Sequence, residues 1–230
     1  MVLLPAAHRC CPGSCAGEFL TPQLAPGDES QVLLDKLPSG SVFINDAGAG
    51  ELGKGEYSGL QLSLEAQTQV AQYDFSAELS REFACLQPSV ALYMQAPFPM
   101  EIYQDSKLVV FRMEYYDMTR VIFLDGRAHP PADAPHSKNG HSVGHWEGDE
   151  LVVDTTHIAS SSFMNNGFSH SDNLHLMERF KLSKGAEMLF ATQVYEDPEV
   201  FQGLAARLMA WRKKEGEYVY PYECDASFGN

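Results

Sequence analysis

The stretch GHSVGHWEGDELVVDTT, from Gly140 to Thr156, consists of two alternating segments on either side of Gly148-Asp149. Alternation with a period of two is typical of β-strands, and glycine at the first central position of a two-residue connection favours a type II′ turn. If that pair forms the turn, Trp146 lies opposite Leu151. The stretch therefore predicts a β-hairpin.

The two faces of this hairpin differ in chemistry, because opposed residues share a face that alternates along each strand. One face looks suited to packing and holds Ser142, Gly144, Trp146, Leu151, Val153 and Thr155. The other is more polar and holds His141, Val143, His145, Val152, Asp154 and Thr156. Asp154 lies diagonally between the two histidines, and a carboxylate beside an imidazole fixes its tautomer and raises its basicity. Either this face simply contacts water, or it is part of an acid–base site.

Strand-like segments dominate the chain after Pro99. They are EIYQ, KLVVFRMEYY, TRVIFL, HSVGHWE, ELVVDTT, LHLMERFKL, EMLFATQVY and EYVYPY, separated by turn residues. We expect a mainly β fold, an antiparallel meander of about eight strands closed into a barrel, which removes exposed sheet edges. One or two short helices are predicted within residues 60–83, and residues 204–214 fit a strand or a helix. Residues 1–30 are expected to form a flexible tail, and 31–230 a single domain.

Two charges interrupt otherwise apolar strand faces. With Asp117-Met118 as a turn, Arg120 shares a face with Phe111, Met113, Tyr115, Ile122 and Leu124, and Glu178 alternates with Leu174, Leu176, Phe180 and Leu182. A charge in such a place needs a partner of opposite sign or an ionic ligand. Arg120 and Glu178 therefore form either a buried structural pair or part of a substrate site.

Composition excludes several classes of protein. The net charge of −15 argues against a nucleic-acid partner. No apolar run approaches the ~18 residues typical of a membrane span. The N-terminal segment is a poor secretion signal, which favours a cytoplasmic location. The chain lacks a phosphate-binding loop, a nucleotide fingerprint and a G-x-S-x-G motif, so we expect no cofactor.

Histidines are dense between residues 129 and 175. Five of them stand at positions 129, 141, 145, 170 and 175. A metal site is one alternative, but the spacings typical of zinc ligands are missing, so no metal is expected.

The motifs VIFLDGRAHP, GHSVGHWEGDELVVDTT, HSDNLHLMERF and the terminal YPYEC resemble a broad, largely uncharacterised bacterial family, many of whose members are exported. The resemblance covers about residues 85–224 and implies a lipocalin-like (calycin) barrel without a settled activity. It also implies that Cys85 and Cys224, to which exported relatives have counterparts, approach each other. The motif positions are Arg120, Asp125, Arg127, His129, His141, Trp146, Asp154, His170, His175 and Glu178. His145 and His157 depart from the family pattern.

These observations favour a cofactor-independent acid–base enzyme, a lyase, isomerase or cyclase, acting on a lipophilic small molecule in a barrel cavity. His141 is the expected base, Asp154 orients it, and His170 is the complementary acid. Side chains expected to contact substrate are Arg120, Tyr115, His145, Trp146, His175 and Glu178. The alternatives are a lipocalin-like carrier without chemistry and a metal-assisted hydrolase. The sequence leaves open whether the protein forms a homodimer.

Overall fold

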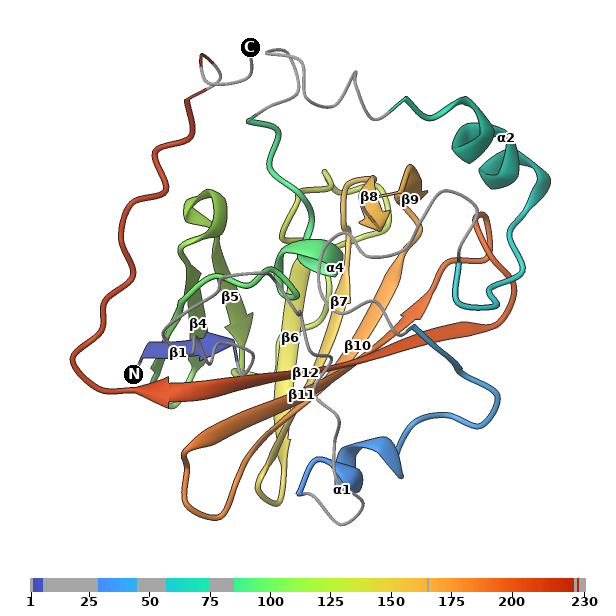
Figure 1. Ribbon diagram of the computed structural model, residues 1–230. Coiled ribbons are helices and arrows are strands. Elements are labelled where there is room, and N and C mark those ends of the chain that lie inside the picture. The colour runs from blue at the N-terminus through green and yellow to red at the C-terminus, as the bar shows by residue number, and fades with distance from the viewer. Residues whose placement is uncertain are drawn as a thin grey trace, which may run out of the picture.

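The computed structural model describes residues 2–5, 29–44, 57–74, 85–164, 166–225 and 227. Within these ranges the fold is mainly β, with few and short helices (Figure 1). The strands are β1 (Val2–Pro5), β2 (Val42–Phe43), β3 (Met100–Gln104), β4 (Leu108–Met113), β5 (Thr119–Phe123), β6 (His141–Glu147), β7 (Glu150–Thr156), β8 (Ser161–Met164), β9 (Phe168–His170), β10 (His175–Leu182), β11 (Met188–Glu196) and β12 (Leu204–Lys214). The helices are α1 (Gln31–Leu34), α2 (Leu64–Gln72), α4 (Val90–Tyr93) and the 3₁₀ turn η1 (Tyr115–Asp117).

One large mixed sheet forms the body of the protein. Its strand order is β1-β3-β4-β5-β6-β7-β10-β11-β12-β2, β1 also pairs with β12, and β8 and β9 pair separately. The predicted all-antiparallel meander is corrected at two places, because β6 runs parallel to β5 and β2 runs parallel to β12. A parallel pair needs a long connection that returns along the sheet, and residues 124–140 supply it between β5 and β6.

Several local predictions can be compared with these elements. The segment 204–214 is a strand, β12. The predicted helical segment contains α2, whose N-cap Ser63 accepts a hydrogen bond from the backbone N–H of Ala66. Its last part, residues 75–83, lies outside the described residues, as do residues 6–28 of the predicted N-terminal tail, whereas residues 2–5 of that tail form β1. EYVYPY is not a strand, because residues 217–222 have no regular secondary structure.

The β6–β7 hairpin has the predicted register. Trp146 pairs with Leu151, and Val143 pairs with Asp154. Gly148 has φ +65° whereas Asp149 does not have a positive φ, as a type II′ turn requires. On the packing face of the hairpin, Gly144 is half-buried and Trp146 at the tip is 47% exposed, while the other residues are buried. The hairpin tip thus extends past the core.

Arg120 and Glu178 form a buried ion pair on the inner face of the sheet, which is one of the two alternatives that the sequence left open. Both side chains are 0% exposed, and Arg120 donates to both carboxylate oxygens of Glu178. Arg120 also donates to Ser142 Oγ at 3.2 Å and to Thr155 Oγ1 at 2.9 Å, while Gln193 Nε2 donates to Glu178 at 2.8 Å. These contacts satisfy the charges inside an apolar core, which lowers the cost of burying them.

The β4–β5 connection is longer than the predicted Asp117-Met118 turn. Phe111, not Tyr115, pairs with Arg120, and Tyr115 lies in η1 between the strands. The register therefore differs by four residues from the predicted one. Because four is an even number, the inner-face residues Phe111, Arg120 and Ile122 were still assigned correctly.

Cys85 and Cys224 form a disulfide, with Cα atoms 5.8 Å apart, so the approach implied by the family resemblance is confirmed. The bond attaches the last part of the chain to the segment before α4. The ring of Tyr222 packs on Tyr115 and Tyr116, which adds an aromatic contact to this attachment. Disulfides of this kind persist in oxidising compartments, and the cytoplasmic location stays a prediction.

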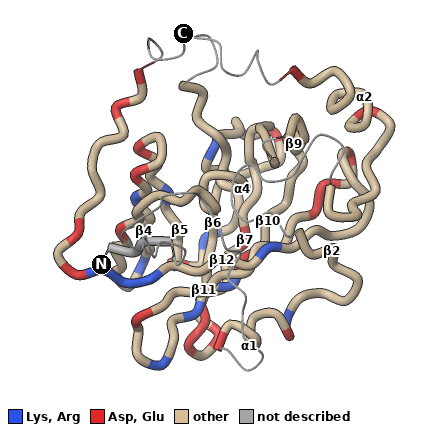
Figure 2. Tube along the Cα trace, in the orientation of Figure 1, with Lys and Arg blue, Asp and Glu red and all other residues tan. Residues whose placement is uncertain are grey.

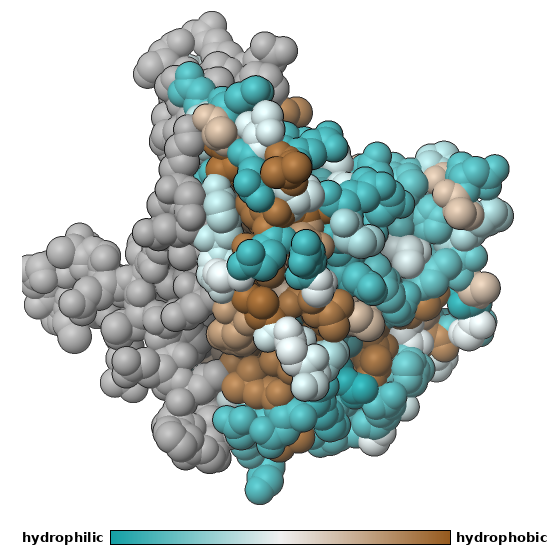
Figure 3. Space-filling view, turned by 90° about the vertical axis from the view of Figure 1, so that its right-hand side faces the viewer, coloured by the Kyte–Doolittle hydropathy of each residue, from teal (hydrophilic) through white to brown (hydrophobic). Residues whose placement is uncertain are grey.

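Charged residues are distributed over many parts of the fold, whereas apolar residues gather on one face. Figure 2 shows acidic residues on many connections with basic residues interspersed. On the face in Figure 3, apolar residues gather in a band bordered by hydrophilic ones. Among the described residues, no helix combines the length and apolar character needed to cross a membrane.

Candidate acid–base site

Asp154 is the centre of a histidine cluster on the outer face of β6, β7 and β10. Its Oδ1 lies 2.7 Å from Nε2 of His129, and its Oδ2 lies 2.6 Å from Nε2 of His175. The three side chains are between 25% and 42% exposed. The carboxylate thus contacts two imidazoles that both remain accessible to solvent.

Strand register brings two of these groups together. Asp154 on β7 pairs with Met177 on β10, so His175, two residues earlier, lies diagonally on the same face. Diagonal neighbours in a sheet are within reach of long side chains. The Asp154–His175 contact therefore follows from the β7–β10 pairing.

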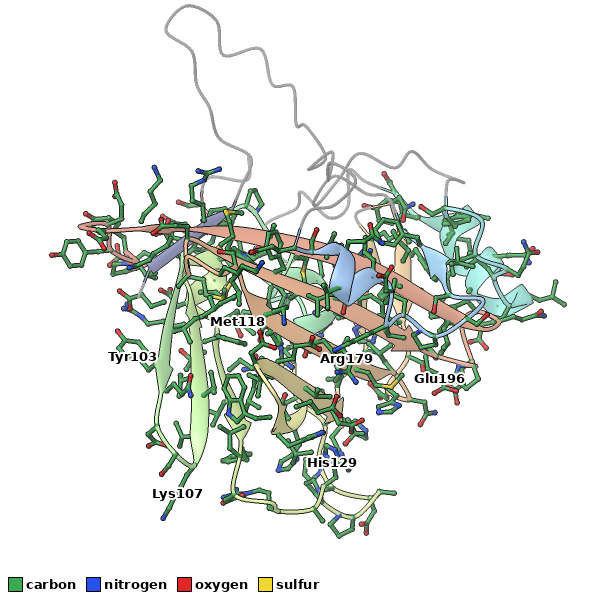
Figure 4. The ribbon with its side chains drawn as sticks, turned by 90° about the horizontal axis from the view of Figure 1, so that it is seen from below. Tyr103, Lys107, Met118, His129, Arg179 and Glu196 are labelled. Carbon is green, nitrogen blue, oxygen red and sulfur yellow. A yellow bond between two sulfur atoms is a disulfide. The ribbon has the colours of Figure 1, made fainter. Side chains whose placement is uncertain are left out.

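The long β5–β6 connection brings His129 over the same face (Figure 4). His157 Nε2 lies 2.9 Å from the carbonyl oxygen of Pro131, and Ser137 bridges to Ile158. The connection then rejoins the sheet at Gly140, where φ is +63° and a Cβ atom would lie 2.6 Å from the carbonyl oxygen of Thr156. Only glycine fits this close approach without strain. These contacts fix the connection that carries His129.

His141 joins the cluster through His129. Their Nδ1 atoms are 3.1 Å apart, so one ring donates and the other accepts. In the arrangement in which Nε2 of His129 donates to Asp154 and its Nδ1 accepts, the shared proton lies on Nδ1 of His141. Nε2 of His141 then has a free lone pair, and none of the described residues hydrogen-bonds it. His141 is thus held in the tautomer of a base.

The environments of His141 and His175 shift their pKa values in opposite directions. Partial burial lowers the pKa of His141, and the nearby charges of His129, Arg127 and His157 lower it further. The hydrogen bond to Asp154 raises the pKa of His175, which outweighs its partial burial. Burial raises the pKa of Asp154, but the hydrogen bonds from His175 and His129 leave it below its usual value. The cluster therefore combines an imidazole that loses its proton more readily than usual, His141, with one that holds its proton more firmly, His175.

Two of the predicted catalytic residues, His141 and Asp154, belong to this cluster, but they are linked through His129 and not directly. His175, predicted to contact substrate, contacts Asp154 as well. The sequence interpretation left out His129 as an active group. It also missed Glu196, whose Oε2 lies 3.8 Å from Nδ1 of His175. A signal for His129 existed in the DGRAHP motif, whereas nothing in the pattern marked Glu196.

His170 lies elsewhere. It is 2% exposed, its Nε2 is 2.7 Å from Oγ of Ser89, and its Nδ1 is 2.8 Å from the carbonyl oxygen of Ser171. Burial lowers the pKa of His170 to about 4. Its imidazole is therefore neutral at pH 7 and unsuited to the predicted role of proton donor.

His170 also lines a pocket of about 730 Å³ between α2 and the β9 region. The lining is mainly polar and includes Glu65, Asp172 and Glu199. A lipophilic ligand needs a mostly apolar cavity, so this pocket does not fit the predicted substrate. The cluster around Asp154 is the better candidate for chemistry, because its ionisable groups contact one another and are accessible to solvent.

The other residues predicted to contact substrate are dispersed. Arg120 and Glu178 are buried in the core network described above. Tyr115 stacks on Phe98, with ring centroids 4.7 Å apart. His145 Nε2 lies 3.2 Å from Glu147 at the exposed hairpin tip, close in sequence to Trp146. None of these five contacts the Asp154 cluster through an interaction of the described residues.

Among the described residues, no group of three or more histidine, cysteine, aspartate or glutamate side chains is arranged to hold a metal ion. No protein-family model matches the chain, and no curated protein matches it. The geometry of the site and the chemistry of its residues therefore carry the functional argument.

Proposed function

We propose that this protein is a cofactor-independent acid–base enzyme in which His141 is the base and His175 is the acid. One observation carries the proposal: the carboxylate of Asp154 is hydrogen-bonded by an imidazole on each oxygen, and the histidines at the two ends of this chain of contacts, His141 and His175, have pKa values shifted in opposite directions. Pairs of titratable groups with separated pKa values are the usual sign of an acid and a base.

In this mechanism Nε2 of His141 accepts a proton from a carbon of the substrate. The positive charge that forms on His141 is stabilised through its Nδ1–H bond to His129, which is itself bonded to the carboxylate of Asp154. His175 returns a proton from Nδ1, while its Nε2–H stays bonded to Asp154. Lyase, isomerase and cyclase reactions on a small molecule all use such proton transfers.

The proposal places substrate on the outer face of the sheet and not in an interior cavity. The inner face is occupied by apolar core residues and by the Arg120–Glu178 pair. We also propose the lipocalin-like barrel and membership of the bacterial family with the DGRxHP motif. The pairing of β1 with both β3 and β12 supports the first, and the disulfide between Cys85 and Cys224 supports the second.

His141→Ala is expected to lower the rate of a general base-catalysed reaction by about 100-fold, the usual contribution of a positioned base. The measurement is the ring opening of 5-nitrobenzisoxazole, in which removal of the carbon-bound proton breaks the N–O bond and releases a coloured nitrophenolate. Because this probe needs only a base, it tests His141 without knowledge of the natural substrate.

The matched control is His136→Ala, which removes an exposed histidine of the same connection that is stacked on His157. The His136→Ala variant should retain the rate of the unmodified protein. Asp154→Asn should lower the rate at least about 10-fold, because it removes the negative charge that stabilises protonated His141 through His129. Equal rates for His141→Ala and His136→Ala would overturn the assignment.

The pH profile of turnover on a substrate that needs both groups should show a plateau between an acid limb and an alkaline limb. The base acts when deprotonated, so activity falls as pH drops through the lowered pKa of His141, below 6.5. The acid acts when protonated, so activity falls as pH rises through the raised pKa of His175, above 6.5. Glu196→Gln should move only the alkaline limb, toward lower pH. Movement of the acid limb instead would contradict the assignment of His175.

A further inference from the structure

Arg127 is part of a stacked layer that begins at the proposed base. The ring of Phe123 stacks on His141 with centroids 5.4 Å apart and an interplanar angle of 27°. The guanidinium carbon of Arg127 lies 3.7 Å from the centroid of the same Phe123 ring. A cation at this distance over an aromatic face is held by the ring quadrupole. The layer therefore fixes a positive charge in the neighbourhood of His141.

One edge of the Arg127 guanidinium is occupied and one is open. Asp125 accepts hydrogen bonds from Nε at 2.9 Å and from Nη2 at 2.6 Å. None of the described residues hydrogen-bonds Nη1, and the Arg127 side chain is 45% exposed. A guanidinium has five N–H donors in a planar fork, so the edge that includes Nη1 remains available for a planar acceptor.

Nearby charges restrict what this edge can bind. Asp125, Asp154 and Glu196 all carry carboxylates in or beside the site, and the chain has a net charge of −15. Such a field disfavours a doubly charged phosphate more strongly than a singly charged carboxylate. One open bidentate edge also matches the two oxygens of one carboxylate.

We propose that Arg127 is the substrate-anchoring residue and that the substrate carries a carboxylate, which Arg127 holds while His141 takes the proton. This inference rests on the proposed function, because it assigns a substrate class to the same site. Phe123 then has two roles, to support the guanidinium and to limit the freedom of the base.

A purely structural role for Arg127 makes a different prediction. The Arg127–Asp125 pair spans two residues of an exposed turn, and such pairs contribute little to stability. If the pair only shapes the turn, Arg127 has no preference between a carboxylate and an uncharged molecule of the same shape.

The test uses benzoate and its uncharged analogue benzamide as probes, with binding followed through the imidazole proton signals of His141 and His129 in NMR titrations. Benzoate should shift both signals in a saturable way, and benzamide should bind at least about 10-fold more weakly. Arg127→Met should reduce benzoate affinity to that of benzamide. Arg127→Lys, which keeps the charge without the fork, should give an intermediate affinity.

Arg112→Met is the matched control, because Arg112 is 41% exposed and paired with Glu101 on another part of the sheet. It should bind benzoate like the unmodified protein. Equal affinities for benzoate and benzamide in the unmodified protein would overturn the anchor, and this comparison needs no variant. If benzoate binds no better than benzamide but 5-nitrobenzisoxazole turnover depends on His141, only the role of Arg127 as anchor is wrong. If benzoate binding depends on Arg127 but turnover does not depend on His141, only the acid–base assignment is wrong.

Discussion

Arg120→Met should destabilise the fold by about 3–5 kcal/mol, the cost of leaving one member of a buried ion pair without its partner. The carboxylate of Glu178 is 0% exposed and would keep only Gln193 as a donor among its described side-chain contacts. Ser142 and Thr155 would lose their shared donor as well. Chemical denaturation monitored by tryptophan fluorescence gives the free energy of unfolding.

The double variant Arg120→Met with Glu178→Gln should recover much of that loss, because it removes both charges together. Arg112→Met, which breaks an exposed pair with Glu101, should cost about 1 kcal/mol or less. A single Arg120→Met variant as stable as the unmodified protein would show that the charge of Glu178 is not confined to the core.

Removal of the disulfide should also have a large effect, with a loss of about 2–5 kcal/mol in the double variant Cys85→Ser with Cys224→Ser. The two cysteines are separated by 139 residues in sequence, so the bond restricts a long loop of the unfolded chain. Thermal and chemical unfolding of the oxidised protein and of the double variant measure the difference.

Reduction of the unmodified protein provides the control. A thiol reductant should bring its stability down to that of the double variant, and it should leave the double variant itself unchanged. If reduction has no effect on the free energy of unfolding, the packing of Tyr222 on Tyr115 and Tyr116 is sufficient to hold the last segment.

Local patterning determined the β6–β7 hairpin and the charges of the core. A two-residue turn at Gly148-Asp149 sets the register of both strands, and every pair follows by counting. The same parity argument placed Arg120 and Glu178 on inner faces, even though the β4–β5 turn was misplaced, because the error was an even number of residues. Periodicity is a short-range property, so sequence alone was enough for these features.

Burial at the ends of strands could not be predicted in this way. Trp146 was expected to pack, but its position at the hairpin tip leaves it exposed. In the segment 217–222 apolar and polar residues alternate as in a strand, but the segment does not form one. A strand also requires a neighbour with free backbone donors and acceptors.

The candidate site was likewise predictable only in part. The sequence by itself determined that His141 and Asp154 share one face of the hairpin, and it left open whether that face contacts water or forms a site. Only the tertiary structure decided that His129 and His175 complete it, and that His170 belongs elsewhere. Those contacts depend on the parallel β5–β6 pairing and on the β7–β10 pairing, which join segments distant in sequence. Contacts of that kind follow from the packing of the whole chain, on which a local pattern carries no information.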